Sequence, residues 1–174
     1  MSNLIMIGMP GSGKSTLGRI LAENIGYDFI DTDNLILEHY KRPLKELIEE
    51  LGTEGFIKAE GEILKEINTD KTVIATGGSA IYNNEGMEHL KSIGKIVYLC
   101  YSISDIQNRV GNLIARGVVC QDCKTLHDLF EERRPYYEKY ADITVHLENA
   151  SIGRSIYKLQ RAVDKYNKKK NYHK

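Results

Sequence analysis

The sequence predicts a three-layer α/β/α sandwich built on a five-stranded parallel sheet. Short apolar runs alternate with longer amphipathic stretches along the chain, and strands that alternate with helices pair in parallel through right-handed crossovers. The apolar runs lack the alternation of a half-exposed strand, which indicates a sheet covered by helices on both faces. With 174 residues and no linker rich in Gly, Ser or Pro, the chain is expected to form a single domain, residues 1–174.

The first expected strand and helix flank a glycine-rich segment near the amino terminus. Residues 4–7 are an unbroken apolar run followed by a glycine, which favours a buried strand. Residues 14–25 favour a helix because apolar side chains recur on one face, at Leu17, Ile20, Leu21 and Ile25. Residues 27–30, with two aromatic residues and an isoleucine, predict the second strand.

The remaining elements follow the same two patterns along the chain. Amphipathic stretches predict helices, and short runs rich in β-branched residues predict strands. The expected helices cover residues 35–40, 44–51, 54–67, 103–110, 126–140 and 152–166, and the expected strands cover residues 72–75, 96–99 and 143–146. Because sheets of this kind bind ligands beyond the carboxyl ends of their strands, the segments that follow the strands should hold the site.

The glycine-rich segment after the first strand matches a phosphate-binding loop. Residues 8–15 read Gly-Met-Pro-Gly-Ser-Gly-Lys-Ser, which fits the pattern G-x-x-x-x-G-K-[ST]. The glycines let backbone N–H groups point at a phosphate, and the helix that follows adds its positive end. Lys14 would supply a charge to the β- and γ-phosphates, and the Ser15 hydroxyl is placed to bind Mg²⁺. The expected strand before and helix after this loop favour binding of a nucleoside triphosphate over a purely structural turn.

Two acidic residues follow the second expected strand. Asp31 and Asp33 stand two positions apart in the run Phe-Ile-Asp-Thr-Asp. One carboxylate can hold metal-bound water near the phosphates, and the other can accept the proton of a substrate hydroxyl that attacks phosphorus. The alternative is that Asp33 caps a helix starting at Asn34, while Asp31 is a solvated loop acid. Beside a phosphate-binding loop we favour the catalytic interpretation.

Several other classes of protein lack support in this sequence. The chain contains no guanine-reading Asn-Lys-x-Asp, and its third expected strand ends in Thr-Gly-Gly rather than in the acid of motor ATPases. The 24 basic and 24 acidic residues balance, which argues against a nucleic-acid partner. No apolar run approaches the roughly 20 residues of a membrane helix, and the amino terminus lacks the features of a signal peptide. We therefore expect a cytoplasmic protein with no membrane partner.

With these motifs the chain resembles the shikimate kinases, which are small-molecule kinases of the nucleoside-monophosphate-kinase-like P-loop group. The resemblance covers about residues 3–146. It is carried by the sequences of residues 8–15, 31–33, 52–60 and 76–79, by Arg116 in the segment 116–119, and by Glu-Arg-Arg-Pro-Tyr-Tyr-Glu-Lys-Tyr-Ala-Asp at 132–142. The resemblance implies the P-loop NTPase fold, a mobile lid at about residues 112–124, and ATP-dependent phosphorylation of a small anionic alcohol. Shikimate, which would give shikimate 3-phosphate in aromatic amino acid biosynthesis, is the leading acceptor.

The resemblance also implies roles for individual residues. The residues that would bind ATP are Gly11, Ser12, Gly13, Lys14, Ser15, Thr16, Arg109 and Arg116, with Arg109 against the adenine and Arg116 closing over the phosphates. Ser15 and Asp31 would hold Mg²⁺. The acceptor would meet Asp33 as the base for its hydroxyl, Gly77 and Gly78 through their backbone, and Arg133 through its carboxylate. Lys14, Asp33 and Arg116 would be the catalytic residues, unless Arg109 and Arg116 are simply exposed arginines.

Three departures from the family pattern concern the acceptor. Where the family has an arginine that completes a two-arginine clamp on the shikimate carboxylate, this chain has Ile57, and Glu60 is retained without that partner. Ser79 replaces the third glycine of Gly-Gly-Gly, and Gly117 replaces the proline after the lid arginine. A lost charge-assisted hydrogen bond costs about 1.5–3 kcal/mol, and Lys58 would compensate only after rotation of the helix. Another polyol or hydroxy-acid acceptor therefore stays open, as does a nucleotide-binding regulatory module without catalysis.

The three cysteines are expected as reduced thiols. Cys120, Cys123 and His127 have the spacing of a zinc clip inside the lid, but structural zinc needs four ligands and Cys100 is distant in sequence. We therefore favour free thiols over zinc binding or redox control. The basic tail at 167–174 is expected to be a solvated end, and we expect a monomer whose partner is its small-molecule substrate.

Overall fold

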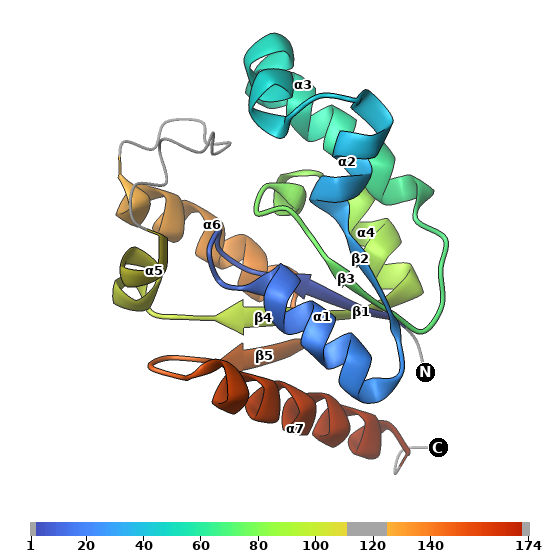
Figure 1. The fold of residues 1–174 in the computed structure, drawn as a ribbon, viewed down its shortest axis with the longest axis vertical. Helices are drawn as coiled ribbons and strands as arrows, with labels where there is room; N and C mark the ends of the chain where they lie inside the picture. The colour runs from blue at the N-terminus through green and yellow to red at the C-terminus, as the bar shows by residue number, and fades with distance from the viewer. Residues whose placement is uncertain (1–2, 111–124, 172–174) are drawn as a thin grey trace.

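The computed structural model describes residues 3–110 and 125–171. These residues contain a five-stranded sheet in the order β2-β3-β1-β4-β5, with every neighbouring pair of strands parallel. Helices cover both faces of the sheet (Figure 1). The predicted α/β sandwich with a five-stranded parallel sheet is therefore confirmed.

The elements follow one another along the chain as strands joined by helical crossovers. The strands are β1 (Asn3–Ile7), β2 (Asp28–Asp31), β3 (Thr72–Ala75), β4 (Gly94–Cys100) and β5 (Ile143–His146). The helices are α1 (Lys14–Ile25), α2 (Thr32–Tyr40), α3 (Leu44–Glu66), α4 (Asn84–Ile93), α5 (Ile103–Val110), α6 (Leu126–Tyr140) and α7 (Ile152–Asn171), with a 3₁₀ turn η1 (Ala80–Tyr82) before α4.

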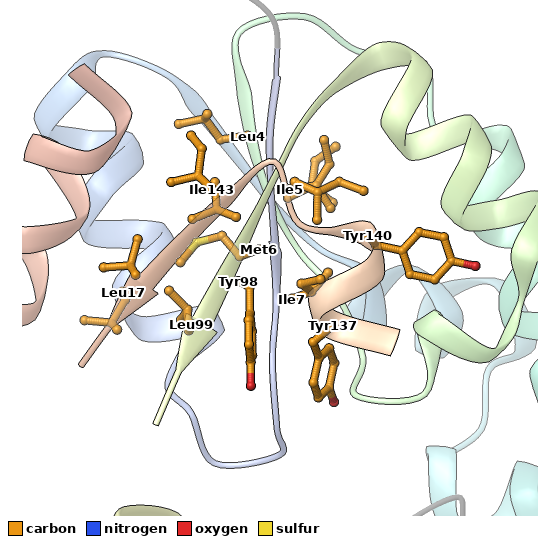
Figure 2. Packing of buried hydrophobic residues seen from close by; sticks show 14 of the residues in the cluster. Leu4, Ile5, Met6, Ile7, Leu17, Tyr98, Leu99, Tyr137, Tyr140 and Ile143 are labelled. Carbon is orange, nitrogen blue, oxygen red and sulfur yellow. The ribbon is translucent and has the colours of Figure 1, made fainter. Parts of the chain in front are cut away.

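The central strand β1 is buried throughout and organises the core. Leu4 and Met6 point toward the side of the sheet that carries α1 and α7, and Ile5 and Ile7 point toward the opposite side (Figure 2). This alternation follows from the two-residue repeat of a strand. Since both faces of the sheet are covered, both sets of side chains are apolar, as the unbroken run at 4–7 predicted.

The helices form two layers that hold the loops in place. Helices α1 and α7 pack together on one face, whereas α4 and α6 pack on the other, with α3 against α4 and α2. In α1, Gly18 lies so close to the sheet that an added Cβ would come within 2.9 Å of Met6 Sδ and of the Phe29 ring. Among the described residues, no helix has the length and apolar character required to cross a bilayer.

Several helical elements differ from the expectation, among them α2 and α4. Helix α2 begins at Thr32 rather than residue 35, because the Asp31 side chain caps it. The two helices expected at 44–51 and 54–67 are both present within α3, where the backbone of Gly52 is non-helical, with φ 68° and ψ 175°, and separates them by a kink. The sequence analysis did not predict α4, whose buried side consists of only Gly86, Met87 and Leu90.

Candidate active site

The loop between β1 and α1 has three glycines with positive φ, Gly8, Gly11 and Gly13. Gly8 has a φ of 149°, and a Cβ there would lie 3.0 Å from the carbonyl oxygen of Leu99. Gly13 has a φ of 84° and precedes the first residue of α1 in a left-handed conformation. The helix thus begins at Lys14 with its unpaired N–H groups directed into the loop. This backbone fits a polyphosphate, which needs closely spaced N–H donors at a helix amino terminus.

Lys14 lies inside the loop rather than on the surface. Its Nζ donates hydrogen bonds to the carbonyl oxygens of Gly8, at 2.8 Å, and Met9, at 3.0 Å. Burial lowers the pKa of Lys14 to about 8, and the negative charge of Asp33 opposes this shift. The ammonium group is therefore held beside the glycine-rich loop, as the motif predicts for a phosphate contact.

The other predicted nucleotide residues divide between described and undescribed parts of the chain. Ser15 and Thr16 are exposed at the start of α1. Arg109 on α5 lies 4.4 Å from the centre of the Tyr101 ring, and its guanidinium donates to the Ala150 carbonyl oxygen at 3.4 Å. Arg116, the lid at about 112–124, Gly117, Cys120 and Cys123 lie outside the described residues.

Asp31 and Asp33 occupy different positions at the carboxyl end of β2. Asp31 caps α2, because its Oδ1 accepts a hydrogen bond from the Asp33 N–H at 3.1 Å. Asp33 lies within the first turn of α2, so the alternative in which it caps a helix from Asn34 is wrong. Burial raises the pKa of Asp33, and the nearby charge of Asp31 adds to that shift, whereas Lys14 opposes it.

The Asp31 carboxylate and the Ser15 hydroxyl are hard oxygen donors, the type that Mg²⁺ prefers. Ser15 is exposed and Asp31 is partly exposed. Their chemistry therefore fits the predicted magnesium site. Among the described residues, no group of three or more His, Cys, Asp or Glu side chains forms a separate metal site.

The backbone after β3 brings together charged side chains from three helices. A Cβ added at Gly77 would lie 2.5 Å from Glu60 Oε1 and 2.9 Å from Asp33 Oδ1. A Cβ added at Gly78 would lie 2.5 Å from an Arg133 Nη1 nitrogen. The Gly77 N–H donates to Thr32 Oγ1 at 3.1 Å, which joins this turn to the start of α2. Glycine is therefore needed here so that the carboxylates and the guanidinium can approach the backbone.

Arg133 is 1 % exposed and is oriented by tyrosines. Its Nε donates to the hydroxyl oxygen of Tyr82 at 3.2 Å. Tyr137 donates from its hydroxyl to the Gly78 carbonyl oxygen at 3.2 Å, and its ring stacks on Tyr98 with centroids 5.1 Å apart. The Tyr137 ring thus packs against the sheet, while Tyr82 and the Tyr137 hydroxyl organise this site.

The sequence analysis recognised Glu60 but did not include it among the site residues. Its side chain is completely buried, and Ser79 donates a hydrogen bond to Glu60 Oε2 at 2.6 Å. Ile57 packs with the smaller apolar cluster that contains Phe56 and Ile63, and Lys58 is exposed. The sequence signal that could have identified the pair formed by Glu60 and Ser79 was a glutamate retained without its arginine partner, together with a serine in place of a glycine.

Known proteins similar to this chain include several shikimate kinases. The family model described as shikimate kinase matches residues 10–164. A shikimate kinase of Francisella tularensis subsp. holarctica is 35 % identical over 161 residues, which cover 90 % of this chain and 92 % of that protein. The structure of shikimate kinase from Acinetobacter baumannii in complex with shikimate has a TM-score of 0.84 and 29 % identity, covering 94 % of this chain and 93 % of that one.

A second kind of relative is much longer. Threonine synthase-like 1 of Pongo abelii is 33 % identical over 167 residues, which are 94 % of this chain. The chain spans about a fifth of the length of that relative, 22 %. Similarity to such a protein concerns one segment of it.

Proposed function

The chain belongs to the shikimate kinase family and is a small-molecule kinase, and on this premise we propose that it transfers the γ-phosphoryl group of ATP to a hydroxyl of shikimate, forming shikimate 3-phosphate and ADP. The observation that carries the proposal is that Asp33 and Arg133 meet at the glycine-rich turn after β3, with Lys14 near enough to interact electrostatically with both. This reaction requires a basic group that binds phosphate, an acidic residue that meets the hydroxyl, and a buried guanidinium that binds the carboxylate.

The chemical step uses these residues in separate roles. Asp33, as carboxylate, takes the proton of the acceptor hydroxyl while the hydroxyl oxygen forms a bond to the γ-phosphorus. The bond from the γ-phosphorus to the bridging oxygen breaks, and the electron pair leaves with ADP. Lys14 is placed to neutralise charge on the transferring group, with its ammonium exchanging the carbonyls of Gly8 and Met9 for phosphate oxygens. Mg²⁺, held by Ser15 and Asp31, would neutralise further phosphate charge.

Arg133 is proposed to bind the acceptor carboxylate. A guanidinium pairs with a carboxylate through two parallel hydrogen bonds, which fixes orientation as well as position. Because Arg133 is buried and its Nε is engaged by Tyr82, the group is held in one orientation before substrate arrives. Arg109 is proposed to lie against the adenine, and Arg116 is proposed to close over the phosphates.

The proposal is tested by ADP release in the presence of ATP and Mg²⁺, with shikimate and a panel of sugar acids, polyols and amino-alcohols as acceptors. We expect turnover with shikimate and formation of a phosphate monoester. Turnover of another acceptor with none on shikimate would leave the kinase assignment intact and overturn the acceptor. ATP binding without turnover of any acceptor would favour a regulatory module.

A second acceptor class is favoured by one observation. Ile57 stands where the resemblance implies an arginine, and no cation from α3 takes its place because Lys58 is exposed. The acceptor site therefore holds a carboxylate less strongly than a two-arginine site would. Another polyol or hydroxy acid is the alternative acceptor that the same panel would reveal.

A further inference from the structure

A second buried carboxyl group lies beside the proposed acceptor position and has no part in the chemical step. Glu60 on α3 is fully buried, and one of its oxygens, Oε2, is bound by the Ser79 hydroxyl. The other oxygen, Oε1, has no hydrogen-bond partner among the residues that the structure describes. That oxygen lies 2.5 Å from the place where a Gly77 side chain would begin, on the same side as Asp33 Oδ1. Glu60 Oε1 therefore has unused hydrogen-bonding capacity beside Gly77 and Asp33.

The charges around Glu60 do not hold it in one ionisation state. Asp33 faces it from α2, Lys14 from α1, and Arg133 and Tyr137 from α6. Burial raises the pKa of Glu60 to about 7, and Asp33 acts in the same direction. The Ser79 hydrogen bond, Arg133 and Lys14 act in the opposite direction. Tyr137 stays neutral near pH 7 because burial raises its pKa.

The helix that carries Glu60 supplies no compensating charge. Ile57, three residues earlier and on the same side of α3, is apolar and packs with the smaller apolar cluster. Lys58 is exposed to solvent. Since Arg133 is also proposed to bind the acceptor carboxylate, ionised Glu60 would add a negative charge beside an anionic acceptor.

We propose that Glu60 contacts the acceptor and selects it by charge, so that the protonated residue admits an anionic acceptor and the ionised residue opposes it. This inference rests on the proposed function, because it takes the turn at Gly77 and Gly78 as the acceptor site. The protonated carboxyl group donates a hydrogen bond to the acceptor through Oε1, while Ser79 holds Oε2 in place. Ser79 is thus a positioning residue, and Glu60 is the residue that selects the acceptor by its charge.

The test is the pH dependence of shikimate binding, measured by titration calorimetry on the full chain. If only the protonated form binds well, affinity follows the protonated fraction, and wild-type Kd should rise about tenfold between about pH 6 and about pH 8. Glu60→Gln should remove this rise, because the amide does not titrate. Ser79→Ala removes the hydrogen bond that lowers the pKa of Glu60, so the rise should move to higher pH.

A second variant keeps the test decisive if Glu60→Gln does not fold. Ile57→Arg places a cation three residues from Glu60 on α3. This cation should keep Glu60 ionised and balance its negative charge, so the Kd for shikimate should no longer depend on pH. A matched Ile57→Met variant should keep the wild-type rise.

The outcomes separate the two proposals. A wild-type Kd that does not change with pH, or the same rise in Glu60→Gln as in wild type, would overturn the role of Glu60 and leave the kinase proposal standing. No binding of shikimate and no turnover by wild type at any pH would overturn the proposed acceptor, and the selection by charge with it.

Discussion

Asp31 and Asp33 are close in sequence, but their different hydrogen bonds suit them to different tasks. Asp31 uses one oxygen to cap α2 and remains partly exposed to solvent. Asp33 is not used as the cap, and its Oδ1 lies at the backbone of Gly77 beside Glu60. The raised pKa of Asp33, caused first by burial, increases its basicity as a proton acceptor.

Replacement of Asp33 by asparagine is expected to separate chemistry from nucleotide binding. The amide cannot take the hydroxyl proton, so kcat should fall by a factor of about 10²–10⁴. The ATP dissociation constant should stay close to that of wild type, because Asp33 is proposed to contact the acceptor rather than the nucleotide. A coupled ADP assay and an ATP titration measure the two effects. Asp28→Asn, at the exposed amino-terminal end of β2, is the control with no expected effect; a full rate in Asp33→Asn would remove this residue from the mechanism.

Replacement of Ile57 by arginine is expected to tighten shikimate binding. A second guanidinium near the carboxylate adds a charge-assisted hydrogen bond, so the KM for shikimate should fall about tenfold or more. Some stability should be lost, because Ile57 packs with the smaller apolar cluster. Steady-state kinetics on Ile57→Arg and on Ile57→Met distinguish charge from packing. An unchanged KM in a folded Ile57→Arg protein would favour another acceptor.

At the scale of elements, the helix boundaries around the site depend on single residues. Asp31 starts α2 three residues earlier than the apolar pattern indicated. Gly52 separates the two helical segments of α3, and Asn83 caps α4 by accepting a hydrogen bond from the Gly86 N–H at 2.8 Å. Together these caps and the kink place Asp33, Glu60 and the turn after β3 next to one another.

The kink in α3 is expected to require glycine. At φ 68° and ψ 175° the backbone of Gly52 is in a region that side chains disfavour, although nothing lies within 4 Å of an added Cβ. Gly52→Ala should therefore lower the free energy of unfolding by about 1–3 kcal/mol, as measured by urea denaturation. Gly153→Ala, in the first turn of α7 and also without neighbours within 4 Å, should leave stability unchanged or slightly higher. Equal effects of the two substitutions would contradict a role for the kink.

At the scale of the whole molecule, the parallel sheet concentrates charge at one edge. The carboxyl ends of β1, β2 and β3 deliver the phosphate-binding loop, the two aspartates and the Gly77–Gly78 turn to the same end of the sheet. Helices α3 and α6 bring Glu60 and Arg133 to that edge as buried charged residues. Burial of such groups costs stability, so the site makes the fold sensitive to pH.

Glu60 is expected to make unfolding depend on pH in a defined direction. Because its pKa rises from 4.5 to about 7 on folding, the folded state favours the protonated form, and stability is lost as pH rises from about 4.5 to about 7. Relative to Glu60→Gln, wild type should lose about 3 kcal/mol across this interval, as measured by urea denaturation at several pH values. Glu54→Gln, an exposed position on the same helix, should follow wild type. Parallel curves for wild type and Glu60→Gln would show that Glu60 does not titrate in this range.

The sequence by itself determined the parallel sheet, the phosphate-binding loop and the order of most elements. These depend on local patterns: apolar runs at 4–7 and 72–75, helical spacing at 14–25, and a glycine spacing that only a curled backbone explains. Short-range signals of this kind are complete within a few residues. The family resemblance extended them to candidate roles at Asp33 and Arg133.

Only the tertiary structure decided which groups share the acceptor side of the site. Glu60 and Ser79 are 19 residues apart, and Arg133 meets Tyr82 across 51 residues, so no local pattern records these contacts. The exposure of Lys58 and the packing of Ile57 depend on where α3 lies against its neighbours. The ionisation of a buried carboxyl depends on its distance from charges on other helices, and that distance exists only in the folded molecule.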